Sequence, residues 1–128
     1  MKAVKTDGAP APVGPYSQAV VHQGLVFASG QIPLDPQSGE LVAGSIEDQT
    51  TRVIANLRAV LEAAGSDLTR VVRTTVYVTD LSLFARVNAV YAAHFTGTPA
   101  PARATVEVAA LPLGAQVEID AIALAPTG

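Results

Sequence analysis

Cysteine and tryptophan are both absent from this 128-residue sequence. The absence of cysteine excludes disulfides, thiol nucleophiles and cysteine-ligated metal sites. The nitrogen ligands that remain, His22 and His94, lie far apart in the sequence and in no metal-binding spacing. We therefore expect no metal site.

Charged side chains are also scarce. They make up 15% of the chain, against about 25% in a typical soluble domain, while 49% of the residues are hydrophobic. With this small number of charges, much of the surface of a monomer would be apolar. We therefore expect part of that surface to be buried against partner subunits. The net charge is −3, and beyond Lys5 every positive charge is an isolated arginine. Neither a basic groove nor an aromatic platform for nucleic acid is expected.

Long hydrophobic runs are missing as well. No stretch approaches the roughly 18 uninterrupted apolar residues of a membrane span, and the first residues contain no apolar core of a secretory signal. We expect a cytoplasmic protein without a membrane partner. The length suits one domain, residues 1–128, with a single hydrophobic core.

The first half of the chain predicts a hairpin followed by a helix. The segment "AVVHQGLVFASGQIP" is typical of two short strands around a turn at residues 22–24. Ser45 and Asp48 have the spacing of a capping box, and apolar residues then recur at helical spacing until Gly65, which is placed to end the helix.

The second half predicts a strand, a second helix and two further strands. The strand covers residues 71–79, and Asp80 is placed to cap the helix that follows. That helix carries an apolar stripe of Phe84, Val87, Tyr91 and Phe95. The last two strands cover residues 103–108 and about 115–124, joined by "AALPLG".

This order indicates an α+β fold in which two helices pack on one face of a single sheet. Alternation along the strand at residues 71–79 places Val72 and Thr74 on one face and Val71 and Tyr77 on the other. Both faces are partly apolar. We therefore expect the face without helices to meet another subunit.

Arg103 opens an apolar strand in the segment "TPAPARATVEVAALP". A hairpin between the last two strands, with Val108 opposite Ala115, would set Arg103 opposite Asp120 and Thr105 opposite Glu118, all on the face without helices. A buried guanidinium needs an anionic or carbonyl partner. That partner is either one of these acids or the carboxylate of a ligand, which the planar guanidinium binds with two hydrogen bonds.

Five other residues are candidates for a site, each with a structural alternative. Tyr16 lies in a Gly/Pro-framed loop, where a tyrosine often only packs. Ser29 and Gly30 end a strand and could form a simple turn. Glu118 lies among apolar residues, so it is either solvated or a proton-transfer group with a raised pKa. Asn88 lies in an apolar helix and could bond internally.

Five segments together resemble one known family. They are "GPYSQAV", "FASGQIPLDPQSGEL", "VVRTTVYVTDLSLFARVNAVYAAHF", "PARATVEVAALP" and "VEIDAIA". In this order and with these gaps, the chain is similar to the RidA/YjgF family of enamine and imine deaminases over nearly its whole length. The resemblance implies a chorismate-mutase-like fold and a homotrimer with a cleft at each subunit interface.

The resemblance also implies an activity: hydrolysis of 2-aminoacrylate and related imino acids with a free carboxylate to 2-keto acids and ammonia, without a cofactor. A non-catalytic, ligand-binding or chaperone-like trimer of the same fold is the alternative. Arg103 matches the arginine that binds the substrate carboxylate, and Glu118 matches the acid that holds the attacking water.

Further positions match the family's substrate-binding residues. Ser29 and Gly30 would position the substrate, and Tyr16 would close the cleft. Asn88 matches a family position whose role could be structural. Thr105 stands where many members have cysteine, and we expect it to act through its backbone, because deamination needs no thiol.

Overall fold

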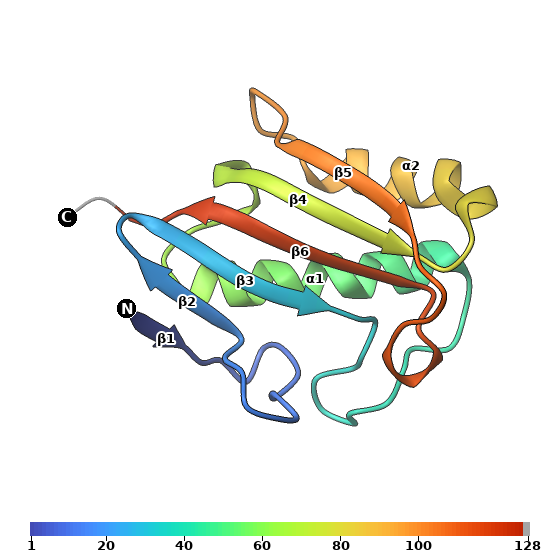
Figure 1. Ribbon diagram of the computed structural model, residues 1–128, viewed down its shortest axis with the longest axis horizontal. Coiled ribbons are helices and arrows are strands. Elements are labelled where there is room, and N and C mark those ends of the chain that lie inside the picture. The colour runs from blue at the N-terminus through green and yellow to red at the C-terminus, as the bar shows by residue number, and fades with distance from the viewer. Residues whose placement is uncertain (127–128) are drawn as a thin grey trace.

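The computed structural model describes residues 1–126 and consists of one six-stranded sheet covered by two helices (Figure 1). The strands are β1 (Lys2–Val4), β2 (Ala19–His22), β3 (Leu25–Gln31), β4 (Val71–Val78), β5 (Ala102–Glu107) and β6 (Val117–Leu124). Their order is β1-β2-β3-β6-β4-β5. All neighbours are antiparallel except β4 and β5, which are parallel. The predicted α+β fold with a mostly antiparallel sheet is confirmed.

The two helices lie on the same side of the sheet, as expected (Figure 1). They are α1 (Ile46–Ala63) and α2 (Phe84–His94), and three short 3-10 turns, η1 (Leu68–Arg70), η2 (Leu81–Leu83) and η3 (Pro112–Gly114), lie in the connections. No helix within residues 1–126 has the length and apolar character needed to cross a bilayer.

The sequence signals at the ends of α1 act as predicted. The Ser45 hydroxyl accepts a hydrogen bond from the Asp48 backbone N–H at 3.1 Å, and the Asp48 carboxylate accepts one from the Ser45 N–H at 3.4 Å. This capping box satisfies two backbone donors that a helix start leaves unpaired. At the other end Gly65 adopts a φ of 82°, which reverses the chain after α1.

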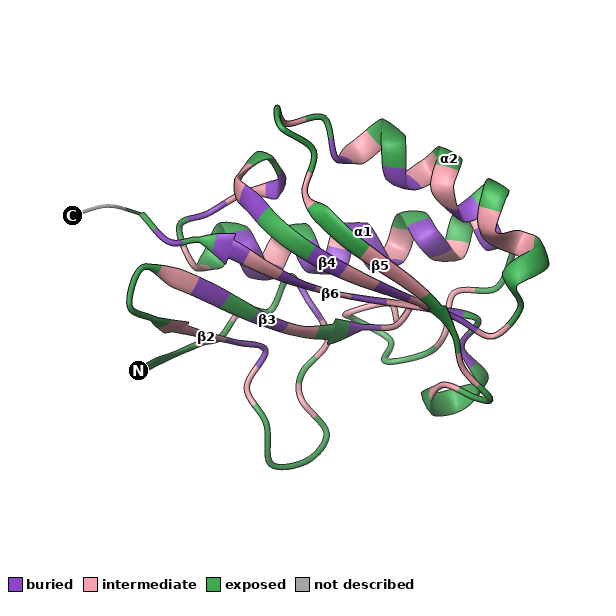
Figure 2. Ribbon diagram, turned by 45° about the horizontal axis from the view of Figure 1, so that its top comes forward, coloured by how far each residue is buried: buried purple, intermediate pink, exposed green. Residues whose placement is uncertain are grey.

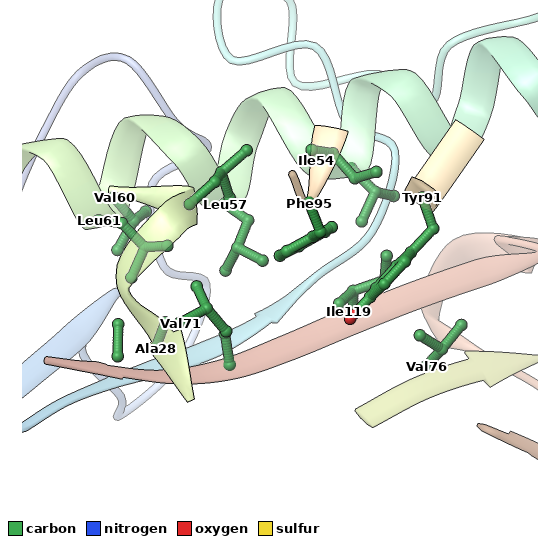
Figure 3. Packing of buried hydrophobic residues seen from close by; sticks show 14 of the residues in the cluster. Ala28, Ile54, Leu57, Val60, Leu61, Val71, Val76, Tyr91, Phe95 and Ile119 are labelled. Carbon is green, nitrogen blue, oxygen red and sulfur yellow. The ribbon is translucent and has the colours of Figure 1, made fainter. Parts of the chain in front are cut away.

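The hydrophobic core fills the space between the helices and the sheet (Figure 3). Ile54, Leu57 and Leu61 of α1 are fully buried and point from the helix toward the sheet. Tyr91 of α2 stacks on Phe95 with ring centroids 4.2 Å apart. The apolar stripes read from the sequence are thus the buried faces of the helices.

The other face of the sheet has no helix on it. Figure 2 shows exposed segments along β3, β4 and β5. Exposed apolar side chains of the sheet include Phe27 at 43% and Val106 at 39% of their full exposure. Patches of this kind are typical of surfaces that bind another protein.

The expected hairpin between the last two strands is wrong. β6 instead lies between β3 and β4, and β5 pairs in parallel with β4 at the edge of the sheet. A helical crossover such as α2 returns the chain parallel to the strand that it leaves. The segment between β5 and β6 contains η3, where Leu113 has a φ of 59°, and it redirects the chain to the centre of the sheet.

Three smaller expectations also need correction. The strand β1 was not predicted, because three residues carry too little pattern. Asp80 caps the 3-10 turn η2 through a 2.9 Å bond from the Ser82 N–H, and α2 begins only at Phe84. A register shift near the start of β4 places Val71 in the core and leaves Val72 41% exposed, which reverses their predicted faces.

An ion pair that links α1 to α2 generates a test. Arg86 donates two hydrogen bonds to the Glu47 carboxylate, at 2.6 and 2.9 Å. They lower the pKa of Glu47 from its ordinary 4.5 to about 2. The pair therefore stabilises the fold above pH 4.5, and this contribution is lost as the pH falls toward 2. We expect Arg86→Gln to return the pKa of Glu47 toward 4.5, measured by NMR titration of its carboxyl carbon.

The matched control is Arg58→Gln, which removes the same charge from an exposed position on α1. It should leave the pKa of Glu47 unchanged. An unshifted pKa of Glu47 in Arg86→Gln would show that the ion pair is not its cause.

Candidate functional site

A cavity of about 660 Å³ lies between the loop before β2, the end of β3, the start of β6 and the η3 turn. Four of the predicted site residues line it: Tyr16, Ser29, Gly30 and Glu118. Most of the remaining wall is apolar and consists of Pro10, Ala11, Val13, Ile32, Leu34, Pro112 and Leu113. The structure thus gathers residues from three distant parts of the sequence around one pocket.

Glu118 is the one charged side chain among the described residues that line this cavity. Its neighbours on β6, Val117 and Ile119, are fully buried on the helix side, so alternation turns Glu118 to the open face. Burial raises the pKa of Glu118, and the nearby charge of Asp120 raises it further. A half-buried carboxyl with a raised pKa is better suited than a solvated one to accept and return a proton.

Gly30 allows the Glu118 carboxylate to lie directly against the backbone of β3. A Cβ atom at this position would lie 2.9 Å from Glu118 Cδ and closer still to Oε2. The pairing of β3 with β6 is irregular between Ala28 and Gln31, which is where this approach occurs. Glycine is therefore needed at position 30 because a side chain there would overlap Glu118, and not because the backbone turns there.

Gln18 organises the loop that forms one wall of the cavity, and the sequence analysis missed it. The side chain is 2% exposed. Its Nε2 donates to the carbonyls of Thr6 and Pro10 at 3.0 and 2.9 Å, and its Oε1 accepts from the Thr6 N–H at 2.7 Å. The available signal was a polar residue placed directly before an apolar strand.

Ser29 and Tyr16 also contact this loop. The Ser29 hydroxyl donates to the Ser17 carbonyl at 2.6 Å. The Tyr16 hydroxyl accepts a bond from the Val13 N–H at 3.3 Å, while the side chain stays 54% exposed. Ser29 therefore holds the loop, and Tyr16 lies partly exposed in the wall of the cavity.

Arg103 lies elsewhere, on the helix side of β5. It pairs with Thr74, which is fully buried beneath α2, and paired residues point to the same side of a sheet. Its Nη1 donates to Asn88 Oδ1 on α2 at 2.7 Å. The expectation that Arg103 shares the open face is wrong, because it assumed that the last two strands pair. Thr105, two residues further along β5, also faces the helix side and does not line the cavity.

The predicted acidic partners of Arg103 are occupied elsewhere. Asp120 accepts a hydrogen bond from the Tyr77 hydroxyl at 2.9 Å, and Glu118 lies in the cavity. Among residues 1–126, no acidic side chain lies within ion-pair distance of Arg103. The structure therefore does not contain the salt bridge that was one of the two explanations for this arginine.

One copy of the chain thus keeps Glu118 and Arg103 apart. Among residues 1–126, the cavity is lined by an acid and no cation, and Arg103 has no acidic side chain within ion-pair distance. Over the part of the chain that the structure describes, no group of three or more His, Asp or Glu side chains could hold a metal ion.

Comparison with known proteins agrees with this fold. A family model described as Endoribonuclease L-PSP matches residues 6–125. The chain is 58% identical to the protein DfrA of Myxococcus xanthus over 125 residues, which are 96% of this chain and 95% of the relative. It is 47% identical to the 2-iminobutanoate/2-iminopropanoate deaminase of Mus musculus over 123 residues, which are 96% and 90% of the two chains.

A solved structure gives the same result in three dimensions. The crystal structure of the YjgF gene product of E. coli superposes with a TM-score of 0.92 at 45% identity. The match covers 97% of this chain and 98% of the other.

The close approach of Gly30 to Glu118 can be tested by a double substitution. Gly30→Ala should destabilise the protein by about 1–3 kcal/mol, because the new methyl group overlaps the Glu118 side chain. In a Glu118→Ala background the same substitution should cost much less, because the overlapping atoms are gone. Urea unfolding of the four proteins measures both costs. Equal costs in the two backgrounds would contradict the assigned role of Gly30.

Proposed function

Since this chain belongs to the RidA/YjgF family, we propose that it is a deaminase that hydrolyses small imino and enamino acids, such as 2-aminoacrylate, to 2-keto acids and ammonia. The observation that carries the proposal is the Glu118 carboxyl, which lies half-buried in a cavity against the Gly30 backbone. Relatives named as deaminases support the same reaction class.

The proposed site needs two copies of the chain. Glu118 lies in a cavity without a cation, and Arg103 lies on an edge strand without an anion. In a homotrimer formed through the open face and the β5 edge of the sheet, Arg103 at that edge of one subunit would reach the cavity of its neighbour. The exposed apolar side chains of that face, such as Phe27 and Val106, would be buried at the interface.

In the proposed mechanism, Arg103 binds the substrate carboxylate through two parallel hydrogen bonds. The enamine tautomerises to the imine. Water then attacks the imine carbon while Glu118 accepts a proton from it and passes that proton to the imine nitrogen, which gives a carbinolamine. Glu118 then accepts the carbinolamine hydroxyl proton and passes it to the same nitrogen. The carbon–nitrogen bond breaks, ammonia leaves, and the new carbonyl oxygen comes from water. Because such imines hydrolyse unaided, holding the two reactants together supplies much of the modest acceleration required.

Four further residues would have supporting roles. The backbone of Gly30 would contact the substrate where no side chain intervenes, and Ser29 would keep the cavity wall in place through Ser17. Tyr16 would close the cavity from its loop. Thr105 would act through its backbone alone. No step uses a metal or an organic cofactor.

RNA cleavage is suggested by the description of the family model. The charge of the chain does not favour it, because a net charge of −3 and isolated arginines offer no groove for a phosphate backbone. A trimer that binds the same ligands without turnover is the remaining alternative.

The reaction is tested in a coupled assay. A serine or threonine dehydratase releases the enamine, and the appearance of 2-keto acid is followed with and without this protein. We expect the wild type to accelerate it and Arg103→Ala and Glu118→Gln each to lose at least about 100-fold of that acceleration, in line with removal of a binding charge or a general base. A wild type that binds 2-oxobutanoate but gives no acceleration would favour the non-catalytic trimer.

The shared site is tested by mixing the two inactive variants. In trimers assembled from equal amounts of Arg103→Ala and Glu118→Ala subunits, about a quarter of the interfaces should unite an intact arginine with an intact glutamate. We therefore expect activity to reappear on co-refolding, while light scattering reports a trimer. Inactivity of the mixed trimers, with each variant assembled normally, would mean that both residues serve the site from one chain.

A further inference from the structure

The guanidinium of Arg103 lies in a cradle formed by three residues of α2. Its Nη1 donates to Asn88 Oδ1 at 2.7 Å, and its Cζ lies 4.7 Å from the centre of the Tyr91 ring and 5.4 Å from that of Phe84. Residues 84, 88 and 91 follow one another at the spacing that places side chains on one face of a helix. The cradle is therefore a continuous stripe along α2.

The cradle is anchored in the core below. Tyr91 is 7% exposed, and its hydroxyl shares a 2.7 Å hydrogen bond with that of Thr74. Its ring also stacks on Phe95. The rings of Tyr91 and Phe84 and the hydrogen bond to Asn88 thus hold the Arg103 guanidinium at the edge of the sheet. A guanidinium without these contacts would have to lose conformational freedom on binding a ligand, which would weaken the binding.

The cradle is also electrically neutral. The faces of aromatic rings and an amide oxygen attract a cation without cancelling its charge. A carboxylate at the same distance would form an ion pair and would compete with any anion that approaches. Within residues 1–126, the ion pair that α2 forms joins Arg86 to Glu47, and Arg86 lies on another face of α2 than the cradle. Arg103 is thus oriented by its neighbours but not neutralised.

We infer that Asn88, Tyr91 and Phe84 are positioning residues that hold the Arg103 guanidinium in one orientation and keep its charge available to the carboxylate of the ligand. The inference rests on the proposed function and deepens it. Asn88 acts on the arginine rather than on the substrate, because its Oδ1 is engaged with Nη1. One N–H of the five donors is used in this way, which leaves a free edge of the guanidinium for a carboxylate.

The decisive substitution is Asn88→Asp, which changes the neutral oxygen into a charged one with almost no change in size. We expect it to weaken binding of 2-oxobutanoate, measured by calorimetry, by at least about tenfold, because the new carboxylate pairs with Arg103. The KM in the coupled assay should rise by a similar factor, with a smaller effect on kcat. Asn88→Ala, which removes one hydrogen bond without adding a charge, should cost only about two- to tenfold.

The matched control is Ala89→Asp. It adds the same charge to an exposed position on the outer side of α2. Binding and KM should stay within about twofold of wild type, since an exposed charge is screened by water and salt. If Ala89→Asp weakens binding as much as Asn88→Asp does, the effect is one of net charge and the inference is wrong.

The aromatic floor is tested with a conservative pair. Tyr91→Phe keeps the ring but loses its hydrogen bond to Thr74, so it should lose less ligand affinity than Tyr91→Leu, which removes the ring. Both affinities are measured at temperatures well below the unfolding transitions of the variants. Equal affinities of these two variants would contradict a role for the ring. Phe84→Leu, at a less buried position, provides the same test with a smaller risk to folding.

These results separate the inference from the proposed function. Calorimetry with 2-oxobutanoate requires no turnover. Weak binding by Asn88→Asp in a protein that proves inactive would support the cradle while the deaminase proposal fails. An active wild type whose affinity is unaffected by Asn88→Asp would overturn the cradle and leave the deaminase proposal intact.

Discussion

The central strand β6 sets the geometry on which the positions of Glu118 and of the strands around it depend. Every second residue from Val117 to Ala123 is buried against the helices, at 3% exposure or less. Both edges of the strand are hydrogen-bonded, to β3 and to β4. A slip of the register by one residue would turn these apolar side chains to the open face and remove them from the hydrophobic core, which would destabilise the fold. The same constraint holds Glu118 on the open face, against the glycine of β3.

The edge strand β5 obeys a different constraint. It has a single neighbour, β4, and α2 crosses over to reach it. Its parallel register places Arg103 beside Thr74 and so beneath α2 rather than on the face of Glu118. The two residues of greatest chemical interest therefore belong to opposite sides of one sheet. An edge strand is also where another chain can approach, which is consistent with a site that is completed between subunits.

Buried polar groups on the two sides of the sheet serve different purposes. Gln18 bonds four backbone groups of a loop that has no regular structure, and it keeps one wall of the cavity in place. Thr74 and Tyr91 satisfy each other and so fix an aromatic ring under Arg103. In both cases a fully paired polar group provides rigidity, while the charged groups, Glu118 and Arg103, are left without a partner of opposite sign.

The sequence by itself determined the local elements: the hairpin, the capped first helix, the strand from residue 71, the stripe of the second helix, and the residues that line the cavity from "GPYSQAV", "FASGQ" and "VEID". Capping, turns and periodicity act over a few residues, so they can be read locally. Only the tertiary structure decided that β6 lies between β3 and β4, that Arg103 lies beside α2, and that Gln18 supports the cavity wall while Tyr91 supports Arg103. Strand order depends on contacts between distant segments. Neither the "AALPLG" connection nor the alternation within a strand indicates which strands will pair with each other.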